Sequence, residues 1–213
     1  MICCLRADYM PRFTRPSSIA SPKQFEMVML TGMMLPLYLA RHATPDWNRK
    51  DLVYHLPPGP PLTDQGKDEA RALAAFLSQE GIRSILSSPL ERCLHTAQIA
   101  AETLQLPVQV VPALIEWQPG EGEEDVQRRL LPIVEQALEA AQPACLVTHG
   151  GPISALLGAM GLPLDERKKI GIFDHGNLVP PAGVWKAARL PTNNHWSLSM
   201  VFKPTTSVDS QAT

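Results

Sequence analysis

The stretch Leu35-Pro-Leu-Tyr-Leu-Ala-Arg-His-Ala-Thr-Pro-Asp-Trp-Asn48 decides the fold. Its first six residues are mainly apolar, as a buried central strand of a parallel sheet is. The strand ends abruptly in Arg41-His42, and a polar loop follows. Because open α/β sheets build their active sites at the carboxyl ends of their strands, this charged pair marks a candidate site.

Strand and helix patterns alternate along the rest of the chain. We expect strands at 35–40, 82–86, 108–114, 144–148, 178–184 and 196–202, and helices at 65–79, 89–104, 126–141 and 153–160. Such alternation predicts an α/β fold, a three-layer α/β/α sandwich around a mostly parallel sheet. In 196–202 apolar and polar residues alternate, which predicts an antiparallel edge strand.

Length and composition favour one domain with extensions. The chain has 213 residues, of which 45% are hydrophobic and 19% charged. We expect a folded domain over 35–203, a flexible N-terminal extension over 1–34 and a flexible tail over 204–213, because the two ends lack a sustained period. The net charge of −2 argues against a surface that binds nucleic acid.

The four cysteines are scattered, and none forms a Cys-x-x-Cys pair. This usage favours a reducing cytoplasm over a disulfide framework. No apolar run reaches the length that spans a bilayer, so we expect no membrane partner. Cys93 and Cys145 fall in a helix and a strand pattern, where we expect them to be core residues.

Functional side chains follow four of the predicted strands. The first strand ends in Arg41-His42, the second leads to Arg92, the third ends near Glu116, and the fourth is followed by His149. In a parallel sheet these ends meet at one edge. Guanidinium groups match phosphate oxygens, an imidazole can attack phosphorus, and a carboxyl group can protonate a leaving alkoxide. The set therefore predicts phosphoryl transfer.

Other interpretations of these residues remain. A lone strand-end histidine is usually structural, and His42, His149 and Glu116 with a nearby aspartate could instead hold a metal ion. A metal site would leave two arginines without a purpose, because cations repel a dication. Glu121 or Glu123 could replace Glu116 as the acid. Four aromatic or imidazole side chains could line the pocket or only pack: Trp47, Tyr54, His55 and Trp117.

Five ordered motifs resemble those of the histidine phosphatase superfamily, which includes phosphoglycerate mutase-like proteins. They are Arg41-His42-Ala43 with Trp47-Asn48, Pro61-Leu-Thr-Asp-Gln-Gly66 with Glu69-Ala70, Ser87-Ser-Pro-Leu-Glu-Arg92 with Thr96-Ala97, Leu114-Ile-Glu116, and Val147-Thr-His-Gly-Gly151. The resemblance covers about 35–202. It implies a phosphohistidine mechanism that needs no cofactor and no metal.

The resemblance also implies a role for each matching position. His42 would be the nucleophile, and Glu116 would be the general acid and then the base. Arg41, Arg92 and His149 would bind the transferring phosphoryl group. Asn48 matches a further position of the phosphate pocket.

Three features depart from the family pattern. Ala43 replaces a glycine, which a negative φ would allow, and Thr44-Pro45 replaces a Glu-Thr pair. The segment between Glu116 and the next helix is short, so we expect a small cap and an open site. A mutase must keep water from its phosphorylated intermediate, so a small cap disfavours that activity.

We therefore expect a metal-independent phosphatase that hydrolyses small phosphomonoesters. The alternatives are a cofactor-dependent phosphoglycerate mutase and a non-catalytic phosphate-binding protein of the same fold. The expected partner is a small phosphorylated metabolite, and assembly into a homodimer is left open.

Overall fold

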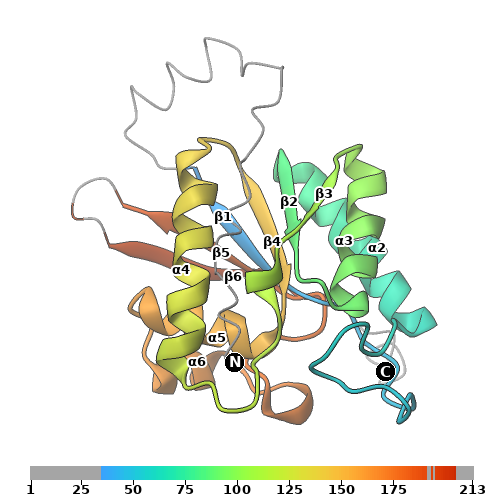
Figure 1. Cartoon of the computed structure of the whole chain (residues 1–213). Helices are drawn as coiled ribbons and strands as arrows, with labels where there is room; N and C mark the ends of the chain where they lie inside the picture. The colour runs from blue at the N-terminus through green and yellow to red at the C-terminus, as the bar shows by residue number, and fades with distance from the viewer. Residues whose placement is uncertain (1–34, 191–192, 194, 205–213) are drawn as a thin grey trace, which may run out of the picture. The chain divides into compact units, whose positions relative to one another are not determined.

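The computed structural model describes residues 35–190, 193 and 195–204. The predicted N-terminal extension and all of the predicted tail except Pro204 lie outside the described residues. In chain order (Figure 1) the elements are β1 (Leu37–Arg41), α2 (Asp64–Gln79), β2 (Ser84–Ser87), α3 (Glu91–Leu104), β3 (Val108–Val110), the 3₁₀ turn η1 (Pro112–Leu114), α4 (Glu123–Glu139), β4 (Ala144–Thr148), α5 (Gly150–Ala159), α6 (Leu164–Ile170), the 3₁₀ turn η2 (Asp174–Gly176), β5 (Val184–Arg189) and β6 (Trp196–Phe202).

One mixed sheet forms the centre of the fold. Its strand order is β3-β2-β4-β1-β5-β6. β3, β2, β4 and β1 pair in parallel, while β5 pairs antiparallel with both β1 and β6. The predicted α/β class and the antiparallel edge strand are therefore confirmed.

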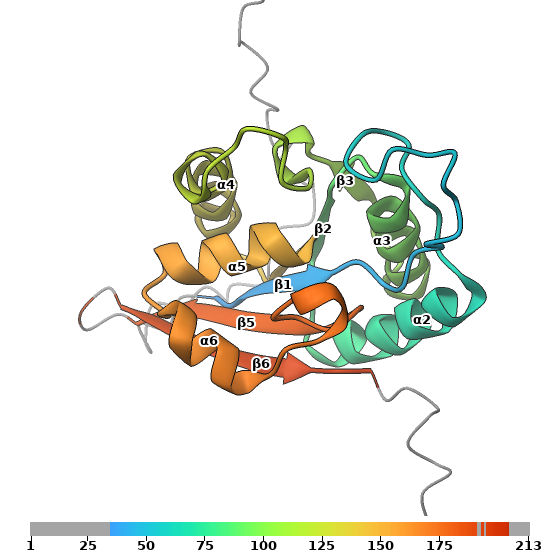
Figure 2. The same cartoon turned by 90° about the horizontal axis from the view of Figure 1, so that it is seen from below.

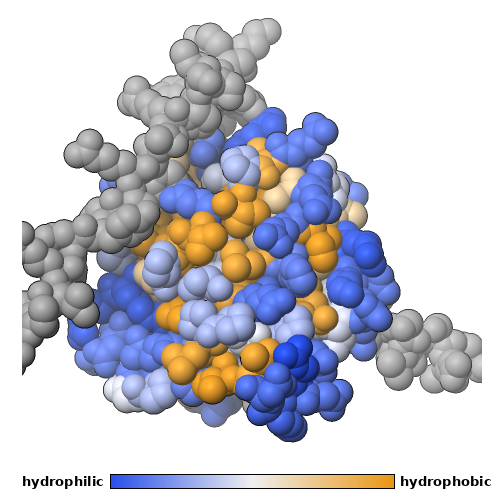
Figure 3. All heavy atoms as spheres, turned by 45° about the vertical axis from the view of Figure 1, so that its right-hand side comes forward, coloured by the Kyte–Doolittle hydropathy of each residue, from blue (hydrophilic) through white to orange (hydrophobic). Residues whose placement is uncertain are grey.

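Helices cover both faces of the sheet (Figure 2). α2 and α3 pack on one face, where they share a core cluster with Tyr38 and Ala40 of β1. α4 and α5 contact each other and β1 on the other face. This arrangement gives the predicted three layers. On the side seen in Figure 3, apolar patches are bounded by hydrophilic side chains.

The register of the parallel strands brings their carboxyl ends together. Arg41 of β1 pairs with Thr148 of β4, and Ser87 of β2 pairs with Val147 of β4. The residues that follow these strands therefore start from neighbouring positions along the same edge of the sheet. In Figure 1 this is the lower edge, where the loop at 44–63 also lies.

Some predicted boundaries were wrong for local reasons. The third strand ends at Val110 instead of 114, because Pro112 begins a 3₁₀ turn. The fifth strand begins only at Val184, after the pair Pro180-Pro181, and not at 178. α6 was not predicted. No helix in the described part of the chain is long and apolar enough to cross a membrane.

α5 begins at Gly150, directly after His149, and not at 153 as expected. His149 itself occupies the N-cap position, with extended backbone. The first backbone N–H groups of a helix have no partner within the helix and favour anions. The earlier start therefore places an anion-favouring helix end beside the candidate site.

Candidate active site

Neighbouring elements hold the backbone around His42 in place. The His42 amide donates to the Thr148 carbonyl (2.9 Å), and the Ala43 amide donates to Thr96 Oγ1 of α3 (3.0 Å). Ala43 is buried, and it is not among the described residues with positive φ. Alanine therefore fits where the family pattern has glycine, as the sequence predicted.

The start of α2 fixes the next residue, Thr44. The carboxylate of Glu69 accepts from both the Thr44 amide (2.8 Å) and Thr44 Oγ1 (2.9 Å). A Cβ on Gly66 would lie 2.2 Å from the Thr44 carbonyl oxygen, so only glycine allows this approach. The motif around Gly66 and Glu69 thus positions the loop that follows the nucleophile candidate.

His42 is fully buried and holds its imidazole in one tautomer. Its Nδ1 lies 2.8 Å from the Ala43 carbonyl oxygen, which can only accept, so Nδ1 carries the proton. Burial lowers the pKa of His42 well below its ordinary value, and the charges of Arg92 and Arg41 lower it further. The imidazole is therefore neutral at ordinary pH, with a lone pair on Nε2.

His149 is also fully buried, with its ring centroid 5.2 Å from that of His42. Its Nδ1 lies 3.1 Å from Nη2 of Arg92, which can only donate, so the proton sits on Nε2 and points to Ser88 Oγ at 2.8 Å. Burial lowers the pKa of His149 well below its ordinary value, and Arg92 is the next cause.

Arg41 and Arg92 are both buried, with at most 1% of each residue exposed to solvent. Arg92 donates to the Tyr54 carbonyl (2.8 Å), and its guanidinium carbon lies 3.8 Å from the Tyr54 ring centroid. Arg41 is bidentate with Asp174, from Nη1 (2.5 Å) and Nη2 (2.8 Å), and Nη1 also donates to the Val179 carbonyl (2.8 Å). Protein partners thus fix both guanidinium planes.

Each of these guanidinium groups keeps a donor without a partner. Nε of Arg41 and Nε of Arg92 are buried and make no hydrogen bond to a described residue. A Cβ built on Gly150 would lie 3.5 Å from Nε of Arg41, so this donor is near the first turn of α5. Unpaired buried donors are costly, and an anion bound here would satisfy them.

Glu116 lies above His149 and Arg92. Its Oε2 is 3.6 Å from His149 Nδ1 and 3.8 Å from Arg92 Nη2, and the Trp117 amide donates to Oε1 (2.9 Å). Burial raises the pKa of Glu116, although the Trp117 hydrogen bond and the arginines oppose the rise. The carboxyl group is thus biased toward its protonated form.

Arg129 of α4 holds the loop that carries Glu116. It donates to the carbonyls of Ala113 (2.5 Å) and Ile115 (2.9 Å) and forms a two-bond ion pair with Glu121. This pairing lowers the pKa of Glu121, which disfavours that residue as a proton donor. The other alternative, Glu123, lies 3.7 Å from Arg167 and not in the cluster.

The structure therefore brings five of the six predicted residues together: Arg41, His42, Arg92, Glu116 and His149. We call Arg41, His42, Arg92 and His149 the floor. The sixth, Asn48, is exposed, and its amide donates to Asp46 Oδ1 within the loop. Its role in phosphate binding stays a prediction.

Three residues in the cluster had no assigned role from the sequence. Tyr54 Oη lies 3.4 Å from His42 Nε2, and its ring stacks on Trp47. Asp174 pairs with Arg41, and Ser88 binds His149. Ser88 belongs to a recognised motif, and Tyr54 was considered for the pocket rim. Asp174 lies in the stretch 173–177, which the sequence places near the site without a role, and its contact with Arg41 crosses 133 positions of the chain.

Among the described residues, no three His, Cys, Asp or Glu side chains lie where they could hold a metal ion together. Cys93 and Cys145 are buried and free, as expected of core residues. Burial raises the pKa of each thiol to about 12. Cys93 Sγ lies 3.4 Å from His149 Nε2 and packs beneath the floor as a neutral thiol.

Comparison with known families decides the affiliation. The model of the histidine phosphatase superfamily (branch 1) matches residues 37–124 and 117–179, which is more than half of the chain. The chain belongs to the histidine phosphatase superfamily. Both matched segments contain floor residues, and together they include the loop that carries Glu116.

The individual relatives are named for different activities. A probable phosphoglycerate mutase of Serratia proteamaculans is 37% identical over 103 residues, 48% of this chain and 47% of that protein. A glucosyl-3-phosphoglycerate phosphatase of Mycolicibacterium vanbaalenii is 29% identical over 168 residues, 59% of this chain and 75% of that protein. The chain thus matches about half the length of the first relative and three quarters of the second.

Solved structures share the fold. The native structure of a mycobacterial glucosyl-3-phosphoglycerate phosphatase superposes with a TM-score of 0.62 at 25% identity. The match covers 78% of this chain and 97% of that one. The sheet and helices described above are therefore those of this superfamily.

Proposed function

We propose that the protein is a metal-independent phosphatase that hydrolyses small phosphomonoesters through a phosphohistidine on His42. The observation that carries the proposal is the pair of buried, unpartnered Nε donors of Arg41 and Arg92 beside a neutral imidazole. Two fixed cations with free donors offer a site for a phosphate dianion. The neutral His42 offers a nucleophile for its phosphorus.

In the first step His42 Nε2 attacks phosphorus, and the bond from phosphorus to the ester oxygen breaks. The proton of Glu116 moves to that oxygen, so the leaving group departs as a neutral alcohol. The proton stays on Nδ1 of His42, which donates a hydrogen bond to the Ala43 carbonyl, and this bond stabilises the positive charge of the phosphorylated ring. Donors of Arg41, Arg92 and the start of α5 hold the phosphoryl oxygens.

In the second step water attacks the phosphorus of phosphohistidine. The Glu116 carboxylate takes a proton from that water, and the P–N bond breaks. Inorganic phosphate leaves, and His42 recovers its lone pair. Glu116 thus acts first as acid and then as base, and burial raises its pKa, which favours the protonated form that the first step needs.

Trapping the phosphoenzyme tests this proposal. The protein is mixed with p-nitrophenyl phosphate, with and without EDTA, and quenched in alkaline denaturant for intact-mass measurement. We expect an added phosphoryl group and steady turnover, both unaffected by EDTA and both lost in His42→Ala. The matched control is His95→Ala, because His95 lies on α3 and is half-buried. Turnover that survives in His42→Ala would overturn the proposal.

One observation favours the mutase alternative: several relatives are named as probable phosphoglycerate mutases. Against it, only residues 117–122 join Glu116 to α4, which leaves little chain to cover a phosphorylated intermediate. Rates of 3-phosphoglycerate isomerisation and of phosphate release, measured with a bisphosphoglycerate primer, separate the two. Isomerisation that far exceeds hydrolysis would favour the mutase.

Several predictions from the sequence extend this proposal. The substrate would be a small phosphorylated metabolite, and the folded domain would span 35–203. A cytoplasmic location and assembly into a homodimer also stay predictions.

A further inference from the structure

A cavity of about 330 Å³ opens beside the candidate reacting groups. Gly150 and Gly151, the first two residues of α5, form part of its wall together with Trp117. A Cβ on Gly150 would lie 3.5 Å from Arg41 Nε, and one on Gly151 would lie 3.4 Å from Glu116 Oε1. The cavity therefore lies beside Arg41, an expected phosphate ligand, and beside Glu116, the expected proton donor.

The position of the cavity matches the path of a leaving group. The expected acid has to reach the ester oxygen, so the rest of the alcohol must extend from the side of the phosphate where Glu116 lies. A Cβ on Gly151 would also come within 3.3 Å of the Trp117 ring. Gly151 thus leaves room for Glu116 and Trp117 beside the start of α5. A Cβ on Gly150 would lie 2.0 Å from Asn177 Oδ1, so the Asn177 side chain fills the space beside Gly150.

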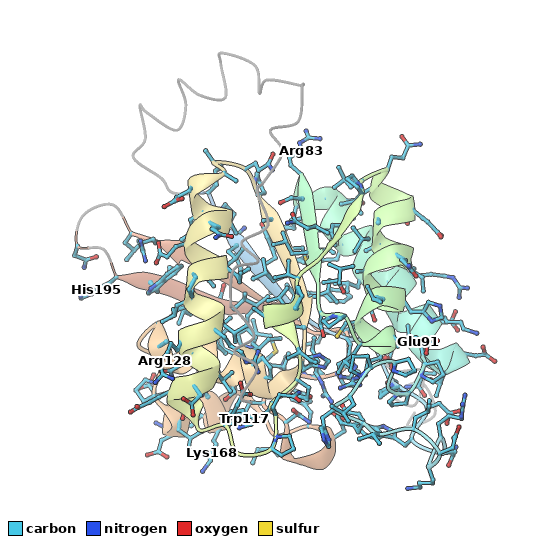
Figure 4. All side chains as sticks on the ribbon, viewed as in Figure 1. Arg83, Glu91, Trp117, Arg128, Lys168 and His195 are labelled. Carbon is cyan, nitrogen blue, oxygen red and sulfur yellow. The ribbon has the colours of Figure 1, made fainter. Side chains whose placement is uncertain are left out.

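The lining of the cavity is mainly apolar, with the polar residues Ser154 and Asn177 and a single cation, Lys168. Trp117 forms one wall, with its indole fixed by a hydrogen bond from Nε1 to the Glu121 carbonyl (2.7 Å). Ile172 and Lys168 lie on the α6 side, and none of the described lining residues is acidic. Figure 4 shows Trp117 and Lys168 at the same end of the molecule. This chemistry suits a carbon-rich group with a negative charge.

A second cavity, of about 400 Å³, provides a contrast. Glu123 and Glu124 line it, and its cation Arg167 is engaged with Ser154 Oγ (2.6 Å) and with Glu123 (3.7 Å). Two carboxylates would repel a phosphorylated metabolite. The charge pattern therefore favours the cavity beside Gly150 as the one that receives substrate.

We propose that the cavity beside Gly150 is the leaving-group subsite, and that Lys168 selects phosphomonoesters whose alcohol carries a carboxylate. This inference rests on the proposed phosphatase function. Lys168 is exposed at the cavity, so its contribution to selectivity is that of a solvent-facing ion pair. Such a pair changes relative rates by about threefold, and added salt weakens it.

Matched substrates test the subsite. 4-Carboxyphenyl phosphate and 4-carbamoylphenyl phosphate share one ring and nearly one shape but differ in charge. We expect the wild-type protein to prefer the carboxylate by about threefold in kcat/KM at low salt. Lys168→Ala should reduce this ratio to about one, and Lys168→Glu should invert it, with the change mainly in KM.

Lys169→Ala is the control, because Lys169 is the next residue of α6 and is not among the lining residues. Lys169→Ala should keep the wild-type ratio of kcat/KM for the two esters. This result would distinguish a local contact of Lys168 from the overall positive charge of α6. The subsite proposal would be wrong if the ratio stayed unchanged in Lys168→Ala, or if the wild-type protein showed no preference. Neither result would contradict the proposed phosphatase function. Absence of turnover with both esters and with p-nitrophenyl phosphate would overturn both.

Discussion

The floor of the site and the loop residues around it differ in how the chain holds them. The floor side chains are at most 1% exposed and project from strand ends or from the first turn of α3. We call Asn48, Tyr54, Glu116 and Asp174 the rim, and they lie on loops or on the short turn η2. Glu116 and Asp174 have side chains that are 15% and 29% exposed. Sheet register fixes the floor, whereas contacts of individual side chains, such as the pair of Asp174 with Arg41, fix the rim.

This difference predicts that floor substitutions have uniform, large effects, while rim substitutions have smaller effects or effects that depend on substrate and pH. In the proposed mechanism Arg41 and Arg92 hold phosphoryl oxygens and His42 attacks phosphorus, and every substrate has these atoms. A rim residue orients another group or acts on the leaving group, which varies.

Arg92→Ala should have the largest effect. Arg92 contacts His149, Tyr54 and the expected phosphate, so its loss should lower kcat/KM on the order of 10³-fold for every phosphomonoester. Circular dichroism would confirm folding, and Arg128→Ala is the control, because Arg128 is an exposed partner of Asp125. A loss that varied strongly with the leaving group would contradict a purely phosphate-binding role.

Glu116→Gln should show the opposite pattern. Glutamine keeps the shape and can accept the Trp117 hydrogen bond, but it cannot deliver a proton. We expect a loss of about 10²-fold with alkyl phosphates and only a small loss with p-nitrophenyl phosphate, whose leaving group needs little protonation. Steady-state kinetics on both ester classes checks this. Equal losses would move the acid role to another group.

The dependence of kcat/KM on pH should reflect the lowered pKa of His42 and the raised pKa of Glu116. The pKa of His42 is lowered, so its imidazole stays neutral and reactive well below pH 6.5, and the acid limb of kcat/KM lies there. The pKa of Glu116 is raised above 4.5, so the rate falls on the alkaline side as its proton is lost. Glu116→Gln should remove that alkaline limb. The phosphate group of the substrate also titrates near pH 6, and it does so equally in both proteins.

Asp174→Ala should have an intermediate effect through Arg41. Without the bidentate partner, the Arg41 guanidinium loses two of its three fixed contacts and can turn its Nε away from the site. We expect kcat/KM to fall about tenfold for all substrates, with weaker inhibition by inorganic phosphate. Asp174→Asn, which keeps one acceptor, should recover part of the loss. Asp125→Ala is a matched surface control.

The sequence was sufficient to predict the floor and the sheet because both depend on local patterns. The apolar run before Arg41 and the glycines after His149 mark strand ends, and a parallel sheet has to align them. The effects of the prolines were harder to predict. The third strand ends before Pro112, and the fifth strand begins only after Pro180, although each sequence pattern looked continuous. Neither composition nor period could predict α6, which has only seven residues.

The rim was less predictable, because a loop contact leaves no periodic signal. Asp174 meets Arg41 only through tertiary packing, and Tyr54 reaches His42 only because the loop at 44–63 folds back over α3. Glu116 was found through its motif, and its raised pKa follows from burial that the sequence alone does not show. Asn48 has the residue type that the motif predicts, and it is exposed on its loop.

Tyr54→Phe should have the smallest effect and tests whether the loop competes with substrate. The Tyr54 hydroxyl lies 3.4 Å from His42 Nε2, which is the place that phosphorus must approach, and burial raises its pKa to about 12. It therefore stays protonated and has to move when phosphate binds. Removing the hydroxyl should leave kcat within about twofold and tighten inhibition by phosphate about twofold, because the lost bond is long and neutral. The ring contacts with Trp47 and Arg92 are retained in phenylalanine. If phosphate inhibition weakened instead, the hydroxyl would be a phosphate ligand, and Tyr54 would belong with the floor.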